Sequence, residues 1–199
     1  MIFWDYIKSF FTEPKWSADM EECKNPDWLM LWNTCKVDPS KNKELHSVCD
    51  KINHNKARYK AVADATHIPW YVIACLHYRE ADLDFTTCLH NGDKLPGPTH
   101  HVPKGRGPFH SWEEAAIDAL KYDEMDKKDY SSLGLTLKAC EAYNGVGYHN
   151  KGIYSPYIWS GTNHYTCGKY AEDGIYDRSL KDQQLGVAAI IKSGYLDAV

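Results

Sequence analysis

The spacing of apolar residues predicts two consecutive helical regions between positions 44 and 80. In the range 44–65, apolar side chains recur three, four or seven positions apart, which is the spacing of one helix face. These side chains belong to Leu45, Val48, Ile52, Tyr59 and Val62. The segment His67-Ile68-Pro69 interrupts this pattern, and Pro69 suits the first turn of a new helix. Residues 70–76 are apolar nearly all round, so we expect the second helix to be central and buried.

After position 80 the pattern changes to short alternating runs, which predict a small β-hairpin. Asn91-Gly92 is a strong signal for the hairpin turn. Pro96, Pro98 and Pro103 limit regular strand pairing in the same region. The hairpin should therefore be short.

Helical patterns return after position 110. The predicted helices cover 112–120, 133–143 and 183–192. A capping box that opens at Ser111 begins the first of them, and either Ser131 or Ser132 can cap the second, which Asn144-Gly145 should end. We therefore expect an α+β fold that is mainly α, with one small hairpin after a central buried helix.

Composition fits one globular domain. The chain has 199 residues, of which 43% are hydrophobic and 25% charged. The formal net charge of −4 offers no basic surface, which argues against nucleic acid and anionic lipid as partners. We expect a monomer with its main domain at 44–199, and an N-terminal helical or irregular extension at 1–43 packed on it.

The first residues, MIFWDYIKSFF, are apolar but too short to span a bilayer, so no transmembrane segment is expected. They lack the basic leader and cleavage site of a secretory signal peptide. Their apolar positions follow helical spacing, and a helix docked on the body is the preferred interpretation. A peripheral membrane anchor is the alternative, although few Lys or Arg residues accompany it.

Neither cysteines nor histidines show the spacing of a metal site. The seven cysteines include no CxxC pair, and we expect mostly reduced, buried thiols. His100 and His101 lie near Cys88, but adjacent residues in an extended strand point to opposite faces. We predict no metal and no cofactor, and a hydrogen bond from His77 or His149 to a group in a binding groove.

Glu80 is the first residue that suggests chemistry. A carboxylate at the C-terminal end of an apolar helix faces desolvation, the negative end of the helix dipole, and the charges of Asp82 and Asp84. All three raise its pKa, which favours a proton donor near neutral pH. Arg79 would oppose this by pairing with Glu80, and an ordinary salt-bridge network is the alternative interpretation.

Several motifs resemble known glycan-cleaving enzymes. The order Glu80, Asp93, Thr99, with five residues between Asp and Thr, resembles the Glu…Asp-x5-Thr arrangement of phage-type lysozymes. The gap between Glu80 and Asp93 is longer than is usual there, so Asp82 and Asp84 stay open as alternatives to Asp93. The segment Tyr143-Asn144-Gly145 is similar to an element that closes the substrate groove in goose-type lysozymes and lytic transglycosylases.

Together with HYRE-x-DLDF, LHNGD and SPYIWSGT, these motifs resemble the lysozyme-like endolysins and muramidases of bacteriophages and some bacteria, over roughly 57–194. The resemblance implies a lysozyme-like fold and hydrolysis of the β-1,4 bond between N-acetylmuramic acid and N-acetylglucosamine in peptidoglycan. Glu80 would be the general acid, Asp93 the base or electrostatic stabiliser, and Thr99 would orient the attacking water. For a phage enzyme it also implies synthesis in the host cytoplasm and action on the cell wall at lysis.

Sugar binding needs flat apolar platforms together with amides and hydroxyls. The predicted substrate-binding residues are Tyr143, Asn144, Tyr148, His149, Tyr154, Tyr157 and Trp159. Core packing is the alternative for Tyr143 and Trp159 in particular. Two other functions stay open: a lytic transglycosylase that acts on the same bond with a single Glu, and a non-catalytic glycan-binding protein of the same fold.

Overall fold

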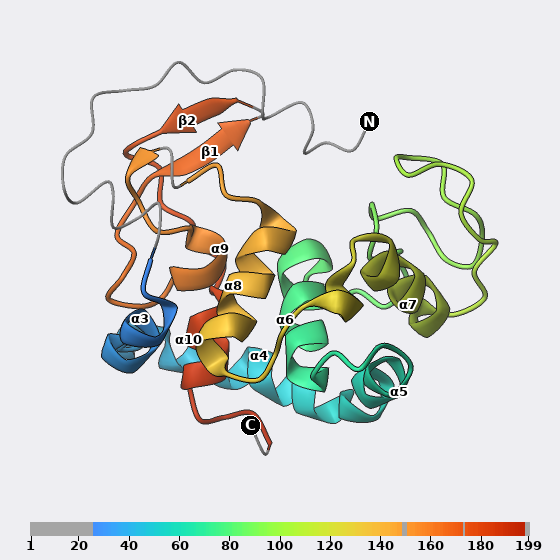
Figure 1. The fold of residues 1–199 in the computed structure, drawn as a ribbon, viewed down its shortest axis with the longest axis horizontal. Helices are drawn as coiled ribbons and strands as arrows, with labels where there is room; N and C mark the ends of the chain where they lie inside the picture. The colour runs from blue at the N-terminus through green and yellow to red at the C-terminus, as the bar shows by residue number, and fades with distance from the viewer. Residues whose placement is uncertain (1–25, 149–150, 173, 198–199) are drawn as a thin grey trace.

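About half of the residues in the computed structural model, which describes residues 26–148, 151–172 and 174–197, are helical (Figure 1). The α-helices are α3 (Trp28–Thr34), α4 (Asn42–His54), α5 (Lys56–Thr66), α6 (Trp70–Ala81), α7 (Trp112–Tyr122), α8 (Leu133–Asn144), α9 (Pro156–Trp159) and α10 (Val187–Lys192). Two 3-10 turns, η1 (Pro39–Lys41) and η2 (Met125–Lys127), and one antiparallel sheet of β1 (Lys169–Glu172) and β2 (Ile175–Asp177) complete the described elements. The predicted class, α+β and mainly α, is confirmed.

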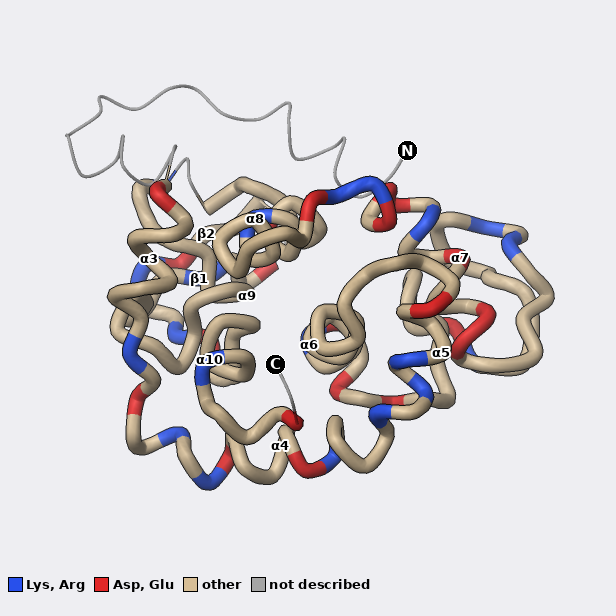
Figure 2. The backbone as a smooth tube through the Cα atoms, turned by 60° about the horizontal axis from the view of Figure 1, so that its bottom comes forward, with Lys and Arg blue, Asp and Glu red and all other residues tan. Residues whose placement is uncertain are grey.

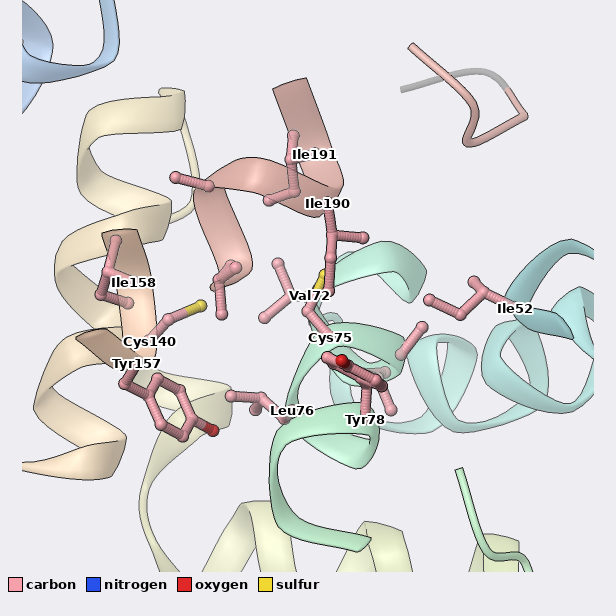
Figure 3. Packing of buried hydrophobic residues seen from close by; sticks show 14 of the residues in the cluster. Ile52, Val72, Cys75, Leu76, Tyr78, Cys140, Tyr157, Ile158, Ile190 and Ile191 are labelled. Atoms are coloured by element: carbon pink, nitrogen blue, oxygen red, sulfur yellow. The ribbon is translucent and has the colours of Figure 1, made fainter. Parts of the chain in front are cut away.

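The helix α6 occupies the centre of the molecule, as its sequence predicts. Residues 72–76 are fully buried. Figure 3 shows Val72, Cys75 and Leu76 facing side chains from surrounding helices, including Cys140 of α8 and Ile190 of α10. Burial of each large aliphatic side chain stabilises the fold by about 1.5–3 kcal/mol. Figure 2 views α6 nearly end-on, with charged positions mostly on the segments around it.

The apolar pattern over 44–65 belongs to two helices, where the sequence predicts one. The helix breaks at Asn55, whose φ of −100° and ψ of 12° lie outside the helical region. The Asn55 side chain donates to the Lys51 carbonyl, and asparagine favours this kind of local bond over a helix interior. The seven-residue step from Ile52 to Tyr59 spans the break, and both residues are still buried in the core.

The predicted helix boundaries near caps hold well. The Ser111 hydroxyl accepts a hydrogen bond from the Glu114 N–H, and Ser132, one of two candidates, caps α8. Gly145 ends α8 with a φ of 93°, a conformation that favours glycine. The last helix is shorter than predicted, because α10 begins at Val187 after an extended Gly186.

The small sheet does not lie where the sequence predicts it. The segment after α6 contains only two isolated bridges, Thr87 to Lys94 and Gly97 to Phe109, because its prolines cannot donate ladder hydrogen bonds. The sheet of the described structure is the β1–β2 hairpin, in which Tyr170 pairs with Tyr176. The predicted hairpin region is therefore an irregular loop, and the true hairpin was not predicted.

The segment before position 44 packs on the rest of the chain where it is described. Leu31 of α3 is buried, and the Trp28 ring stacks at 6.2 Å on Trp159. The predicted N-terminal helix over residues 2–11 lies outside the described residues. No helix of the described chain is long and apolar enough to cross a membrane.

The described cysteines are free thiols. Five of them, Cys35, Cys49, Cys75, Cys88 and Cys140, are buried, and Cys167 is exposed. The predicted burial is confirmed for these five cysteines but not for Cys167, and Cys23 lies outside the described residues.

Candidate active site

Glu80 lies in the last turn of α6, where the helix leaves the core. Residues 72–78 are buried, whereas Glu80 is exposed. The helix ends at Ala81, and the next residue, Asp82, caps it with a left-handed φ of 49°. The chain turns away at that point, so Glu80 combines a helical backbone with access to solvent.

One hydrogen bond holds the Glu80 side chain. The Tyr157 hydroxyl of α9 donates to Oε1 of Glu80 at 2.8 Å. Tyr157 is buried, and its backbone N–H donates to the Ser155 hydroxyl that caps α9. A fixed donor therefore meets one oxygen of the carboxyl group.

The surroundings of Glu80 favour its protonated form. Desolvation by the protein atoms around the carboxyl group raises its pKa, although the Tyr157 hydrogen bond and the Arg79 charge oppose this. The negative charge of Asp123, at the C-terminal end of α7, raises the pKa further. The predicted direction is confirmed, with Asp123 acting where Asp82 and Asp84 were expected.

Arg79 does not pair with Glu80. Its Nη2 donates to Oδ2 of Asp182 at 2.9 Å, and both side chains are nearly inaccessible to solvent. Its Nη1 donates to the carbonyl groups of Gln184 and Leu185. The alternative of a salt bridge between Arg79 and Glu80 is therefore excluded by the geometry.

Tyr143, one of the residues predicted to bind substrate, lies close enough to Glu80 to feel its charge. Its ring packs against the core from α8, and burial together with the charges of Glu80 and Asp123 raises its pKa well above the usual value. Asn144, the last residue of α8, is half-buried. Tyr143, the first residue of the Tyr143-Asn144-Gly145 element, thus adjoins the acid, and the contact of this element with substrate stays a prediction.

Two aromatic residues predicted to bind sugar belong to the core. Trp159 is fully buried and stacks on Trp28, so it has no free face for a sugar ring. Tyr157 is also buried and contributes its hydroxyl group instead of its face. Tyr154 is half-buried, with its ring edge against Trp159 and His164.

Tyr148 remains a candidate platform at the β1–β2 hairpin. Its ring is half-buried and meets the Tyr170 ring at 5.1 Å, and Tyr170 in turn meets Tyr176 at 5.4 Å. The Tyr148 hydroxyl accepts a hydrogen bond from the Tyr170 N–H. The neighbouring His149 lies outside the described residues.

Asp93 is bound within the irregular loop after α6. Its Oδ2 accepts from the N–H groups of His100 and His101 at 2.7 and 2.9 Å, and Oδ1 lies 2.6 Å from Nδ1 of His101. Burial alone would raise its pKa, but these hydrogen bonds outweigh burial and lower the pKa to about 2. Asp93 therefore fixes the loop, and its catalytic role stays a prediction.

Thr99 is also fully engaged in that loop. Its hydroxyl donates to the Pro103 carbonyl at 2.5 Å and accepts from the Arg106 N–H at 3.0 Å. Both hydrogen-bonding directions of the hydroxyl are used within the loop itself. The role of Thr99 in orienting water stays a prediction.

The alternatives to Asp93 are placed as turn residues. Asp84 accepts hydrogen bonds from the N–H and hydroxyl of Thr86, which lower its pKa, and Asp82 caps α6.

His77 is buried, with its Nδ1 3.0 Å from the Tyr59 hydroxyl, and burial lowers its pKa to about 4. The predicted groove contact of His77 is therefore wrong, because its ring faces the core between α5 and α7.

Three charged residues of this region were not predicted: Asp123, which acts on Glu80, and Asp182 and Lys169, which form a network with Arg79. Lys169 on β1 donates to Oδ1 of Asp182 at 2.9 Å. None of the three belongs to a periodic apolar pattern, and their partners are distant in sequence, so no pattern in the chain could have grouped them.

Comparison with known proteins adds no relative: no family model, no curated protein and no solved structure matches the chain. Within the described residues, no three His, Cys, Asp or Glu side chains converge as a metal site.

Proposed function

We propose that the protein is a peptidoglycan-degrading muramidase in which Glu80 is the general acid. The observation that carries this proposal is the environment of Glu80. The residue is accessible to solvent, its pKa is raised, and its carboxyl group is held by one hydroxyl donor. A general acid needs this combination, because it must be protonated at working pH and within reach of substrate.

The chemistry requires one proton donor at the bond that breaks. Glu80 gives its proton to the glycosidic oxygen as the bond to C1 breaks. Water then adds to C1, and its proton restores Glu80. Tyr143 and Asn144 adjoin the acid and would contact the sugar on one side. The motifs that resemble lysozyme-like enzymes support peptidoglycan as the glycan.

A lytic transglycosylase is the second candidate, and one observation favours it. Asp93 and Thr99, the residues expected to handle water, have their polar atoms engaged inside the loop. With Glu80 as the single catalytic carboxyl group, the C6 hydroxyl of N-acetylmuramic acid would attack C1 in place of water. The product would then be an anhydro sugar.

Lysis of permeabilised Gram-negative cells, followed as loss of turbidity, tests the function. Glu80→Gln should lower the rate by about 10²–10⁴-fold, the usual contribution of a general acid. The matched control is Glu124→Gln, which removes an exposed carboxylate paired with Lys127 and should leave the rate unchanged. Equal lysis by wild type and Glu80→Gln would overturn both candidates.

Mass spectrometry of digested sacculi separates the two candidates. Reducing N-acetylmuramic acid ends are expected from the muramidase, and their replacement by anhydromuropeptides would establish the transglycosylase instead. The Glu80→Gln protein serves as the blank for both products.

A further inference from the structure

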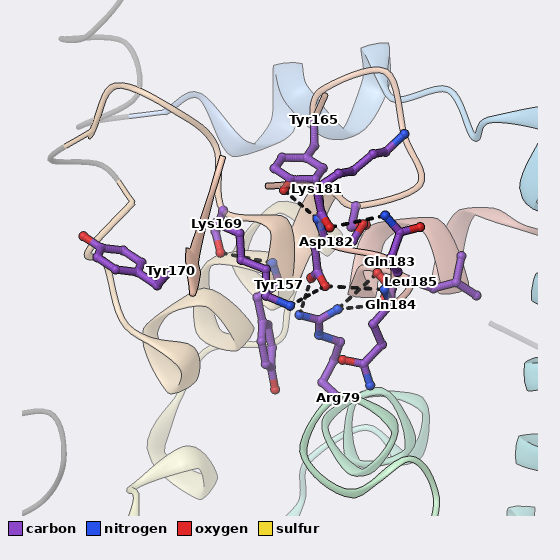
Figure 4. A network of polar contacts seen from close by, with 12 residues as sticks. Arg79, Tyr157, Tyr165, Lys169, Tyr170, Lys181, Asp182, Gln183, Gln184 and Leu185 are labelled. Carbon is purple, nitrogen blue, oxygen red and sulfur yellow. Dashed lines mark hydrogen bonds and ion pairs between the residues drawn. The ribbon is translucent and has the colours of Figure 1, made fainter. Parts of the chain in front are cut away.

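A buried network of charges lies next to Glu80 but does not include it. Figure 4 shows the Arg79 guanidinium group directed at Asp182, with the Tyr157 ring beside it. Asp182 is bound by Arg79 through Oδ2 and by Lys169 through Oδ1, each at 2.9 Å. One carboxylate thus connects α6, the β1–β2 hairpin and the segment that leads into α10.

The position of Asp182 is fixed by its backbone as well as its side chain. Its N–H donates to the Tyr165 hydroxyl at 3.0 Å, and its carbonyl accepts from the Ser160 hydroxyl at 3.1 Å. Its side chain is 2% exposed. Burial would raise its pKa, but the charges and hydrogen bonds of Arg79 and Lys169 outweigh burial and lower the pKa. Asp182 is therefore a rigid, ionised anchor.

Arg79 connects this anchor to the acid. Its guanidinium carbon lies 4.8 Å from the centre of the Tyr157 ring, a cation–π distance. The hydroxyl of the same ring donates to Glu80. Arg79 and Glu80 are neighbours in sequence, yet the guanidinium group turns toward Asp182 and leaves the carboxyl group to Tyr157.

We propose that Asp182 is a positioning residue for Glu80: it holds the Arg79 cation against the Tyr157 ring and prevents it from pairing with the catalytic carboxyl group. This inference rests on the proposed function of Glu80. An Arg79 side chain free to reach Glu80 would form a charge-assisted ion pair and keep the acid ionised. Asp182 thus keeps a neighbouring cation from stabilising the ionised form of the acid.

The groups that act on Glu80 come from α6, α8, α9 and the end of α7. They are Arg79 of its own helix, Tyr157 of α9, Tyr143 of α8, and Asp123 after α7. Arg79 is the cation among these four residues, and Asp182 is the carboxylate that binds it. Removal of Asp182 and removal of Arg79 should therefore shift the pKa of Glu80 in opposite directions.

The test is a pH titration of the Glu80 carboxyl carbon by NMR in the full chain, with the signal assigned by its loss in Glu80→Gln. Asp182→Asn should lower the Glu80 pKa, because Arg79 is no longer neutralised. Arg79→Met should raise it, because the cation is gone. Each shift should be about half a pH unit or more, since a nearby charge moves a carboxyl pKa by roughly 1–3 units. The high-pH limit of lytic activity should move in the same direction as the pKa.

Glu113→Gln is the matched control. Glu113 also binds an arginine, Arg58, whose guanidinium group lies 3.9 Å from the centre of the Phe85 ring. This pair does not act on Glu80. The control should therefore leave the Glu80 titration unchanged, even if it lowers stability.

A double variant keeps the test decisive if Asp182→Asn fails to fold. Because Asp182 is proposed to act through Arg79, Arg79→Met with Asp182→Asn should show the same Glu80 pKa as Arg79→Met alone. Shifts in one common direction, no shift, or a double variant that differs from Arg79→Met would overturn the proposal and assign Asp182 a purely structural role. The titration does not depend on turnover, so inactivity of the wild type on sacculi would refute the proposed function separately.

Discussion

Glu80 lies at the end of α6 and Asp93 lies inside the irregular loop that follows, and the environments of these two carboxylates are opposite. Glu80 is exposed, accepts one hydrogen bond from Tyr157, and has a raised pKa. Asp93 is buried, is bound by three nitrogen atoms of the loop, and has a pKa of about 2. The number of donors decides the difference, because each donor stabilises the ionised form. A carboxyl group with few donors can deliver a proton, and one with many fixes a loop.

The largest expected effect is the loss of stability in Asp93→Asn. The neutral amide accepts fewer and weaker hydrogen bonds from His100 and His101, and we expect the free energy of unfolding to fall by about 1–3 kcal/mol at pH 7. Urea denaturation measures this change. Activity per folded molecule should stay near that of wild type, because Asp93 holds the loop. The control is Asp129→Asn, an exposed aspartate that accepts from the Ser131 N–H.

A severe loss of activity in folded Asp93→Asn would contradict the division of roles in which Glu80 donates the proton and Asp93 only fixes the loop. It would show that Asp93 serves as the second catalytic group despite its hydrogen bonds in the loop.

A smaller effect is expected from Tyr157→Phe. Its hydroxyl donates to Glu80 and lowers the pKa of that carboxyl group, so its removal should raise the Glu80 pKa. The high-pH limit of activity should then move upward by about one pH unit, as one hydrogen bond to a charged group is worth roughly 1.5–3 kcal/mol. Tyr130→Phe, which removes a hydroxyl bonded to the Met125 carbonyl, should not move this limit. A downward shift in Tyr157→Phe would refute the assigned role of the hydroxyl.

The same two carboxylates show what the sequence can and cannot predict. The central helix is predictable from its apolar run. The raised pKa of Glu80 is predictable because a carboxyl group at the end of a buried helix is desolvated. The lowered pKa of Asp93 depends on how the loop folds back to place two backbone N–H groups against the carboxylate. That geometry has no signature in residue types.

Other residues lie elsewhere than predicted for the same reason: their environment depends on partners that are distant in sequence. Trp159 and Tyr157 look like sugar platforms in sequence, because an aromatic residue in a polar segment suits both a surface and a core. Burial distinguishes the two, and burial here depends on Trp28, which lies far away in sequence. Asp182 could not be connected with Arg79 for the same reason, whereas the caps at Ser111 and Ser132 depend on neighbours within three residues and were predictable.

The smallest expected effect concerns stability in Glu80→Gln, and it has the opposite sign to that in Asp93→Asn. Because the folded pKa of Glu80 is raised above 4.5, its contribution to stability is complete below that pH and is lost as pH rises through the folded pKa. The glutamine side chain carries no charge, so the variant should be slightly more stable than wild type at pH 7, by roughly 0.5 kcal/mol or less because solvent screens an exposed group. At pH 4 the two proteins should converge.

Asp93 follows the reverse rule: its lowered pKa gives stability that is present above about 3.8 and is lost as pH falls through about 2. Thermal unfolding of both variants between pH 3 and pH 7 therefore tests the comparison with one measurement. The difference between wild type and Asp93→Asn should shrink toward low pH, while that between wild type and Glu80→Gln should grow toward neutral pH. Parallel curves for the two variants would mean that the loop and the helix end hold their carboxylates in the same way, which the hydrogen bonds of the structure argue against.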